Sequence, residues 1–226
     1  MLGGSEFFYR FIRVVLFILY KAFFRLRATH TELVPKEGDG RGVILAPNHA
    51  SYLDPPIMGV TLERRVTYLA KDYLFKHWFV GWVLRNIGAY PIKSGDGNDF
   101  RSIRDLVRIL KQGAVVTVFP EGTRSETGHF KEPEGGIGFL AVKSGAWVVP
   151  VYIKGSYDAF PKGAKGFKCR PIEVHYGVPF IPAENPEWAK GGDEGYQAVG
   201  KKIMADIARL KVGVEESGNR GIEESR

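Results

Sequence analysis

Short apolar runs alternate along the chain with longer segments of helical spacing, and glycine, proline or polar residues separate them. Aliphatic and β-branched runs predict strands at residues 42–47, 66–71, 115–119, 148–153 and 172–176. Helical spacing predicts helices at residues 55–62, 75–87, 99–112, 136–143 and 195–210. Strands that alternate with helices are typical of an α/β sheet. We therefore expect an α/β fold with a mixed, largely parallel sheet flanked by helices.

The first thirty residues differ from the rest because apolar and basic residues are interleaved without a break. The longest uncharged run, Val14 to Tyr20, has seven residues, whereas a membrane-spanning helix needs about 20. The segment also lacks the small-residue cleavage site of a secretory signal peptide. Neither a spanning helix nor a cleaved leader explains this composition.

Placed on a helix at about 100° per residue, residues 5–27 separate into a narrow charged stripe and a broad apolar face. The stripe contains Glu6, Arg10, Arg13, Lys21 and Arg25. This pattern is typical of an amphipathic helix that lies in the interface of a bilayer. The alternative is a helix that packs onto its own domain, although the apolar face is too wide for one neighbour. We expect an N-terminal amphipathic membrane-associated helix.

Composition restricts the remaining possibilities. A chain of 226 residues with 44% hydrophobic residues can form one sizeable domain. The single cysteine, Cys169, excludes an internal disulfide and every multi-cysteine metal site. A net charge of +7 with a basic N-terminus indicates an anionic partner, either phospholipid head groups or nucleic acid. The aromatic and aliphatic residues between the N-terminal charges favour a phospholipid surface, so we expect no nucleic acid partner.

These patterns divide the chain into three predicted parts. Residues 1–30 form a membrane-anchoring amphipathic helical segment, and residues 31–212 form the main domain. Residues 213–226 carry four glutamates against two arginines and few large apolar residues, so we expect a disordered acidic tail.

A histidine and an aspartate follow the strand at 42–47 directly, within Asn48–Asp54. Catalytic groups gather at strand ends in such sheets. A histidine near its reference pKa of about 6.5 can take a proton from an alcohol at neutral pH. It is a better base when a carboxylate holds its other ring nitrogen, and five residues of separation let Asp54 reach back to His49. The structural alternative is that both residues only cap helices or turns.

A second polar segment, Phe119–Ser125, leaves the strand at 115–119. It offers a carboxylate, a glycine-freed backbone, two hydroxyls and a guanidinium, from Glu121, Gly122, Thr123, Ser125 and Arg124. A guanidinium can hold a phosphate through two parallel hydrogen bonds. Lys131 follows in a loop and adds a second positive charge. The structural alternative is a polar turn with a solvated arginine.

Together the two segments resemble the phospholipid-synthesis acyltransferase family typified by bacterial 1-acylglycerol-3-phosphate acyltransferase. That family shows the blocks N-H-x-x-x-x-D, G-x-x-P-[IV]-[KR], F-P-E-G-T-R-S and V-P-[VI] in this order. Here they stand at Asn48–Asp54, Gly88–Lys93, Phe119–Ser125 and Val149–Val151. The first and third blocks are specific, and the resemblance covers residues 40–155 closely and the whole chain loosely. In the second block Lys93 replaces a frequent arginine, which keeps the charge and loses the bidentate fork.

The resemblance implies an enzyme that moves a fatty acyl group from an acyl thioester to the free hydroxyl of 1-acylglycerol-3-phosphate (lysophosphatidic acid), forming phosphatidic acid in phospholipid biosynthesis. His49 then removes the hydroxyl proton during attack on the thioester, and Asp54 orients and supports the imidazolium. The implied substrate-binding residues are Lys93, Glu121, Gly122, Thr123, Arg124, Ser125 and Lys131. Among these, Arg124 with Lys93 or Lys131 holds the phosphate, and Glu121 holds the glycerol part. Backbone N–H groups near Gly122 or at a strand-to-helix turn are expected to stabilise the oxyanion.

The resemblance identifies the predicted domain at residues 31–212 as an acyltransferase catalytic domain. It also implies the partners of this domain. The donor is acyl-acyl carrier protein or acyl-CoA, a substrate, so we expect no cofactor. We expect no metal either, because the chain has no H-E-x-x-H motif and no clustered His/Cys set. The amphipathic helix places the enzyme on a membrane phospholipid surface, and we expect a monotopic, peripheral protein at the cytoplasmic face of the cell inner membrane.

Other functions remain open at this point. The acceptor can instead be glycerol-3-phosphate, another lysophospholipid or an aminolipid. A lipid hydrolase is a second class, although the chain has no G-x-S-x-G elbow. A non-catalytic lipid-binding protein is a third, and the presence of both His49 and Asp54 argues against it.

Two further helices carry candidate surfaces. The aromatic helix at 75–86 lines an acyl groove or enters the membrane, or else packs as ordinary core. The following helix has Asn98 or Asp99 as its expected N-cap. Its basic residues Arg101, Arg104 and Arg108 bind acyl carrier protein or lipid head groups, or else form a solvated face.

Overall fold

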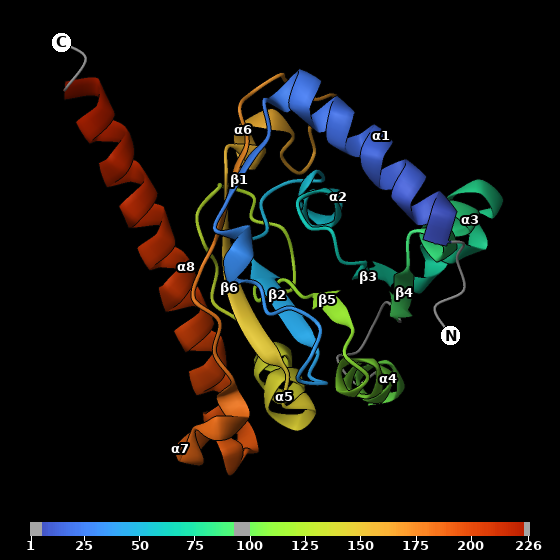
Figure 1. Ribbon diagram of the computed structural model, residues 1–226, viewed down its shortest axis with the longest axis vertical. Helices are drawn as coiled ribbons and strands as arrows, with labels where there is room; N and C mark the ends of the chain where they lie inside the picture. Colours follow the sequence, from blue (N-terminus) through green and yellow to red (C-terminus); the bar gives the residue numbers. More distant parts are fainter. Residues whose placement is uncertain (1–5, 93–99, 224–226) are drawn as a thin grey trace.

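A central sheet organises the computed structural model, which describes residues 6–92 and 100–223 (Figure 1). Within these residues seven strands pair in the order β1-β7-β6-β2-β5-β3-β4. They are β1 (Arg27–Thr29), β2 (Val43–Pro47), β3 (Val66–Lys71), β4 (Ala89–Ile92), β5 (Val115–Thr117), β6 (Trp147–Lys154) and β7 (Glu173–Tyr176). Neighbouring strands run parallel except β6 and β7, which are antiparallel. The predicted α/β fold with a mixed, largely parallel sheet is confirmed.

Helices cover both faces of the sheet. They are α1 (Glu6–Phe24), α2 (Asp54–Val60), α3 (Trp78–Asn86), α4 (Phe100–Lys111), α5 (Gly135–Ser144), α6 (Ser156–Ala159), α7 (Pro186–Ala189) and α8 (Gly192–Glu223), with 3₁₀ turns η1 (Thr31–Leu33), η2 (Asp72–Lys76) and η3 (Pro182–Glu184). On one face α1 packs on α2, and on the other α8 packs on α5 and β6 (Figure 1).

The strand β2 lies at the centre and is buried on both sides. Val43 and Leu45 belong to the apolar core beneath α1 and α2, whereas Ile44 and Ala46 belong to the core beneath α5 and α8. A strand that is covered on both faces needs a continuous apolar run instead of an alternating one. This explains why its sequence was recognisable as a buried strand, and it fixes the position of the loop that follows Pro47.

The helix expected at residues 75–87 is split, which corrects the sequence prediction. The turn η2 ends at Lys76, His77 is extended (φ −75°, ψ 121°), and α3 begins at Trp78. Phe75 and Trp78 therefore do not share one helix face. Phe75 packs against the core, whereas Trp78 is 81% exposed.

Two short strands were not predicted. β1 has three exposed residues and no apolar run, and β4 is only four residues long and contains Pro91, which disfavours a strand. β1 pairs with β7, which means that the predicted segment 1–30 contributes a strand to the main sheet as well as a helix.

The predicted disorder of the acidic tail is wrong for the described part of that segment, because α8 continues to Glu223. Val199, Ile203 and Ile207 are fully buried and anchor the helix upstream. Later turns therefore extend an existing helix and avoid the cost of nucleation. The ion pair between Lys211 and Glu215, one turn apart, adds local support. The predicted N-cap of α4 at 98–99 lies outside the described residues.

The helix α1 has two different faces. On the inner face the Val66 N–H donates to Tyr9 Oη (3.0 Å), and Tyr20 Oη donates to the Leu53 carbonyl (3.2 Å). The outer face leaves Phe7 80% and Ile18 59% exposed. The helix therefore packs onto its own domain and still presents an uncovered apolar face. Among the residues that the structure describes, no helix has the length and apolar character needed to cross a membrane.

Candidate active site

The two polar segments come together because they leave neighbouring parallel strands. β2 pairs directly with β5, so the loops after both strands emerge at the same edge of the sheet. The Ser125 N–H donates to the His49 carbonyl (2.7 Å), and the Val118 N–H donates to the Leu45 carbonyl (2.9 Å). These contacts place the two segments side by side, so their side chains can act on the same ligand.

His49 and Asp54 form a hydrogen-bonded pair. Nδ1 of His49 lies 2.9 Å from Oδ2 of Asp54, whose side chain is fully buried. The same oxygen accepts the backbone N–H groups of Ala50 (2.8 Å) and Ser51 (2.7 Å). The carboxylate holds Nδ1 as a proton donor, so Nε2 keeps its lone pair. Nε2 is therefore the atom that can act as a base.

The start of α2 explains why Asp54 is free to reach the histidine. The helix begins at Asp54 and has prolines at its next two positions, where a missing N–H costs nothing. Its N-cap, Leu53, makes no side-chain cap. Asp54 therefore forms its hydrogen bonds with the preceding loop and does not cap α2. Its predicted role as the partner of the base stays a prediction.

Two residues of the site had no role in the sequence analysis. The Phe119 ring stacks on the His49 imidazole, with centroids 3.8 Å apart and planes at 19°. The Asn48 amide donates to the Ile153 carbonyl (3.2 Å) and accepts the Ile153 N–H (2.7 Å), which ties the loop to β6. Asn48 begins the motif block at residues 48–54, and Phe119 begins the block at residues 119–125. Their place in these two motifs was the signal in the sequence that could have identified them.

Glu121 connects the two loops through their backbones. Its Oε1 accepts the His49 N–H (2.8 Å), and its Oε2 accepts the Lys131 N–H (3.0 Å). Burial raises the pKa of this carboxyl, and the two backbone hydrogen bonds lower the pKa in part. Since both oxygens are engaged and the residue is 2% exposed, Glu121 positions the His49 backbone. Its predicted contact with the acceptor stays a prediction.

Arg124 lies over an aromatic ring next to the base. Its Cζ is 3.7 Å from the centroid of the Tyr52 ring. Stacking of this kind holds the guanidinium plane and leaves its N–H edge open for a ligand. Within the described residues no carboxylate pairs with Arg124 and no acceptor takes a hydrogen bond from its side chain.

The remaining predicted residues have structural contacts of their own. The Ser125 Oγ donates to the His129 carbonyl (2.7 Å), and Lys131 Nζ donates to Thr123 Oγ1 (2.5 Å). Gly122 has a φ of +66°, and a Cβ there would lie 2.2 Å from the Glu134 carboxylate. Ser125 and Gly122 therefore shape the loop, while Thr123 and Lys131 lie at its surface.

The other two blocks support the site from a distance. Val149–Val151 lies in β6, where Val151 pairs with Pro47 at the end of β2. Gly88 has a φ of +81° and turns the chain from α3 into β4. Lys93, the predicted phosphate contact of the second block, lies outside the described residues.

A cavity of about 1060 Å³ opens beside His49. Its size exceeds that of a typical small-molecule pocket. Polar lining near the base comes from His49, Thr123 and Arg124, and α1 adds the charged side chain of Arg13. The walls between α1, α3 and α4 are otherwise mostly apolar. The apolar lining includes Leu16, Leu74, Leu84, Ile103, Leu106 and Leu140.

The chemistry of this arrangement is that of base catalysis. Over residues 6–92 and 100–223, no three His, Cys, Asp or Glu side chains are grouped so that they could hold a metal ion. The site offers an imidazole with a buried carboxylate partner, an unpaired guanidinium and a long apolar cavity. These features define an enzyme that activates a hydroxyl group or water beside an anion and an apolar chain.

Comparisons with known proteins agree with this class. The family model described as Acyltransferase matches residues 25–154. The crystal structure of the 1-acyl-sn-glycerophosphate (LPA) acyltransferase PlsC from Thermotoga maritima has a similar fold, with a TM-score of 0.65 and 25% identity over 90% of this chain and 81% of that chain.

Two curated relatives are similar in sequence. The 1-acyl-sn-glycerol-3-phosphate acyltransferase of Streptococcus pneumoniae is 26% identical over 92% of this chain and 74% of its own length. The chloroplastic LPAT1 of Arabidopsis thaliana is 31% identical over 54% of this chain, and the match spans only 35% of that relative's length. Because the family model matches more than half of the chain, the protein belongs to the acyltransferase family.

Proposed function

We propose that the protein transfers a fatty acyl group from an acyl thioester to the free hydroxyl of 1-acylglycerol-3-phosphate, forming phosphatidic acid in phospholipid biosynthesis. The observation that carries this proposal is the His49–Asp54 pair at 2.9 Å, placed beside a large, mostly apolar cavity and an Arg124 that has no carboxylate partner in the described part of the chain. The names of the relatives support the choice of acceptor.

In the proposed reaction, Nε2 of His49 takes the proton of the acceptor hydroxyl while the hydroxyl oxygen attacks the thioester carbonyl carbon. A carbon–oxygen bond forms, and the negative charge moves to the carbonyl oxygen. Asp54 stabilises the imidazolium through Nδ1 without taking its proton. The carbon–sulfur bond then breaks, and the leaving thiolate takes the proton from His49. The acceptor hydroxyl is activated directly, so no acyl-enzyme forms.

The developing oxyanion needs hydrogen-bond donors. The N–H groups of Gly122 and Thr123, which the sequence suggested, donate within their own loop to Phe119 (3.1 Å) and Glu121 (2.7 Å). The first turn of α5 is a better source, because Gly136 and Ile137 line the cavity and helix N-termini have N–H groups without intrahelical partners. We assign the oxyanion to this turn.

The acceptor phosphate is assigned to Arg124. The guanidinium lines the cavity together with His49 and Thr123, so a single ligand can meet the base and the cation. Its fork matches the geometry of a phosphate. Lys131, bound to Thr123, adds charge nearby, and Lys93 keeps its assignment from the resemblance as a further phosphate contact.

A membrane surface is the proposed location of the reaction, because the acceptor and the product are membrane lipids, although the transferred acyl group comes from the thioester donor. The apolar docking surface consists of Phe7, Phe11, Ile18, Phe23, Trp78 and Phe79, all of them exposed. An aromatic contact between Phe8 and Trp82 (4.8 Å between ring centroids) joins the α1 part of this surface to the α3 part, and Phe23 lies against Phe167 (5.9 Å) at the other end of α1. Such an extended exposed apolar surface is typical of a membrane contact. We place the enzyme as a monotopic protein at the cytoplasmic face of the cell inner membrane.

The donor, acyl-acyl carrier protein or acyl-CoA, and the exact acceptor are tested together. Purified protein is given mixed acyl thioesters with 1-acylglycerol-3-phosphate, glycerol-3-phosphate, lysophosphatidylcholine or a lyso-aminolipid, and the products are identified by mass spectrometry. We expect phosphatidic acid as the dominant product. Preferred acylation of an acceptor without a phosphate monoester would contradict the assignment, and release of free fatty acid without transfer would indicate a hydrolase.

A further inference from the structure

The inner face of α1, which packs against the domain, carries one charged residue, Arg13. This face follows the spacing i, i+4, i+7, i+11 and consists of Tyr9, Arg13, Leu16 and Tyr20. Tyr9 and Tyr20 bind the domain through hydrogen bonds to Val66 and Leu53. Arg13 lies between them on the side that packs over α2. The charged stripe of the sequence therefore does not include Arg13, which is turned toward the domain and away from Arg10.

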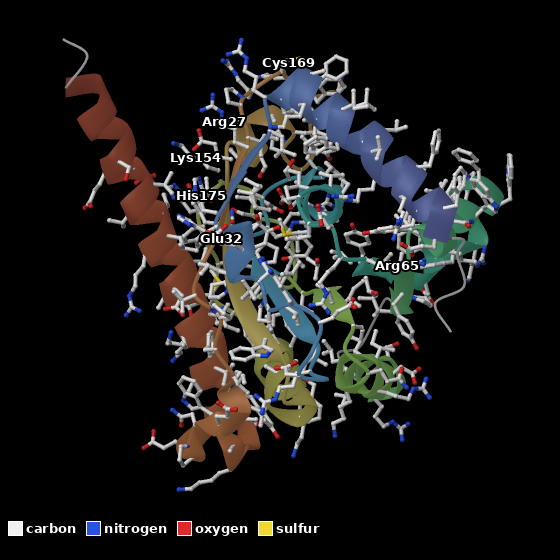
Figure 2. The ribbon with its side chains drawn as sticks, in the orientation of Figure 1. Arg27, Glu32, Arg65, Lys154, Cys169 and His175 are labelled. Atoms are coloured by element: carbon white, nitrogen blue, oxygen red, sulfur yellow. The ribbon has the colours of Figure 1, made fainter. Side chains whose placement is uncertain are left out.

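Arg13 has no counter-charge. Its Nε is buried and donates no hydrogen bond, and in the described ranges no carboxylate lies within ion-pairing distance of its guanidinium. Other arginines in this region are paired. Arg10 bonds to Glu6 (2.9 Å), and Arg65, which Figure 2 shows near α3 and the N-terminal part of α1, lies 3.7 Å from the same carboxylate. A partly buried cation without a partner loses solvation and gains nothing in return.

Arg13 lines the same cavity as His49 and Arg124. The cations of the lining are Arg13, Lys71, Arg124 and Lys162, against the single acid Glu134. Lys162 is already paired with Glu126 (2.5 Å). An anion in this cavity therefore meets two guanidinium groups, one from the loop after β5 and one from α1, that have no carboxylate partner among the described residues.

We propose that Arg13 is a phosphate-binding residue of the substrate cavity, and that α1 thereby contributes a substrate contact in addition to its membrane-facing side. The proposal rests on the proposed function, in which both substrates carry phosphate: the acceptor as a monoester, and the donor at the end of its pantetheine arm, as a phosphodiester in acyl carrier protein or a pyrophosphate in coenzyme A. A guanidinium fork suits either one. The acyl chains carry no charge and give Arg13 nothing to bind.

The first test compares three variants in detergent micelles, where membrane binding does not limit the rate. Arg13→Gln removes the charge, Arg13→Lys keeps the charge without the fork, and Arg10→Gln removes the same charge from the outer side of the same helix. Loss of a charge-assisted contact weakens binding by about tenfold to a hundredfold. We expect Arg13→Gln to raise one substrate's KM by this factor with a small change in kcat, Arg13→Lys to be intermediate, and Arg10→Gln to keep both KM values.

The two kinetic arms identify which phosphate is bound. A rise in the acceptor KM alone assigns Arg13 to the acceptor monoester, and a rise in the donor KM alone assigns it to the phosphate of the donor. Unchanged KM values for both substrates in an active Arg13→Gln protein would overturn the proposal. The Tm of Arg13→Gln is a control for structure, because removal of an unpaired charge is expected to keep or raise the Tm, whereas a structural arginine would lower it.

A binding measurement separates this proposal from the proposed function. Calorimetry with a short-chain 1-acylglycerol-3-phosphate and, separately, coenzyme A is performed on the His49→Ala protein with and without Arg13→Gln, so that no turnover is required. We expect Arg13→Gln to weaken one of these ligands by about tenfold or more. If Arg13→Gln weakens binding in this way but the wild-type protein transfers no acyl group, the proposed function is rejected and the phosphate site is kept. Equal affinities of the two proteins for both ligands would reject the site.

Discussion

Two histidines follow or lie in different strands of the sheet and are matched in exposure and in the length of the hydrogen bond at Nδ1. Each side chain is 13% exposed, and each Nδ1 makes a 2.9 Å hydrogen bond. His49, at the end of β2, is bonded to the buried Asp54 carboxylate and lines the large cavity. His175, in β7, is bonded to the Thr29 hydroxyl of β1 and lies beside Lys154 at the sheet edge (Figure 2).

The difference between these regions is in what surrounds each imidazole. At the sheet edge the charges are mutually paired: Glu173 lies 3.4 Å from His175 Nε2 and 3.8 Å from Lys154. In the cavity Asp54 holds the base through a hydrogen bond, whereas Arg124, stacked on Tyr52, has no ion-pair or hydrogen-bond partner among the described residues. A site with a cation that lacks a carboxylate partner next to a free ring nitrogen can bind an anionic ligand. The charged groups near His175 already interact with one another and stabilise the fold instead.

The largest expected effect separates the two histidines directly. His49→Ala removes the base and should lower kcat by about 10²–10⁴ or more while the fold persists. His175→Ala, matched in burial and in substitution, should keep kcat within about twofold, because it lies outside the cavity. Steady-state rates with circular dichroism as the folding control check this pair. Comparable losses of kcat in both variants would remove the distinction between the regions.

Asp54→Asn tests the partner of the base. The amide keeps the shape of the side chain but cannot stabilise the imidazolium, so kcat should fall on the order of 10²-fold or more with a small change in KM. At the sheet edge, Glu173→Gln is the matched change of a carboxylate near a histidine, and it should leave kcat unaltered. A normal kcat for Asp54→Asn would mean that the carboxylate only holds the Ala50 and Ser51 backbone.

Arg124→Ala should raise the acceptor KM by about tenfold to a hundredfold, because it removes a charge-assisted contact to phosphate. The donor KM should change less. Lys154→Ala removes a charge that Glu173 already neutralises and should change neither value. The decisive comparison uses acceptors with and without the phosphate, since an equal loss for both would exclude phosphate binding by Arg124.

The outer face of α1 is expected to contribute to membrane binding, and this contribution is shared among several exposed residues. Phe11→Asp combined with Ile18→Asp should release the protein from vesicles, because both side chains are exposed and each loses its apolar contribution to membrane binding. Val178→Asp with Val212→Asp is a matched pair of exposed apolar residues away from α1. Co-sedimentation with anionic vesicles measures this. If the two pairs behave alike, the apolar docking surface is not the membrane contact.

The smallest expected effect concerns stability at the sheet edge. Burial lowers the pKa of His175 below its ordinary value of 6.5, although Glu173 opposes this shift of the pKa. The folded protein therefore favours neutral His175, and this contribution to stability is present above the ordinary pKa. It is lost as pH falls through the lowered pKa of the folded state. Denaturant unfolding at several pH values should show a weaker acid slope for His175→Gln, and an unchanged slope would contradict the sign.

The site could be predicted from the sequence because its chemistry follows two strand ends. The apolar runs before His49 and Glu121 indicated buried strands, and the motif blocks of the resemblance linked the two loops. The structure adds the parallel pairing of β2 with β5 that brings the loops together. The Asn48 contact with Ile153 could not be predicted, since it spans 105 residues and depends on β6 being next to β2. Local hydrophobic patterns contain no information on strand order.

The inward position of Arg13 was missed for a related reason. A helical projection orders residues around α1, but it does not say which side meets the domain. Tyr9 and Tyr20 define that side through hydrogen bonds to segments far along the chain, and Arg13 shares it. Likewise, the break between η2 and α3 follows from one extended residue, His77, that carries no helix-breaking signal.

The central claim, that His49 activates the acceptor hydroxyl directly, is tested most simply by rapid-quench measurement of thiol release. Wild-type enzyme is mixed with acyl thioester alone, and 1-acylglycerol-3-phosphate is added afterwards. We predict no thiol release before the acceptor is added, release matched one-to-one by phosphatidic acid afterwards, and no measurable release by His49→Ala in either phase. A burst of thiol equal to the enzyme concentration before the acceptor is added would show an acyl-enzyme and contradict the assignment of His49 as the base for the acceptor.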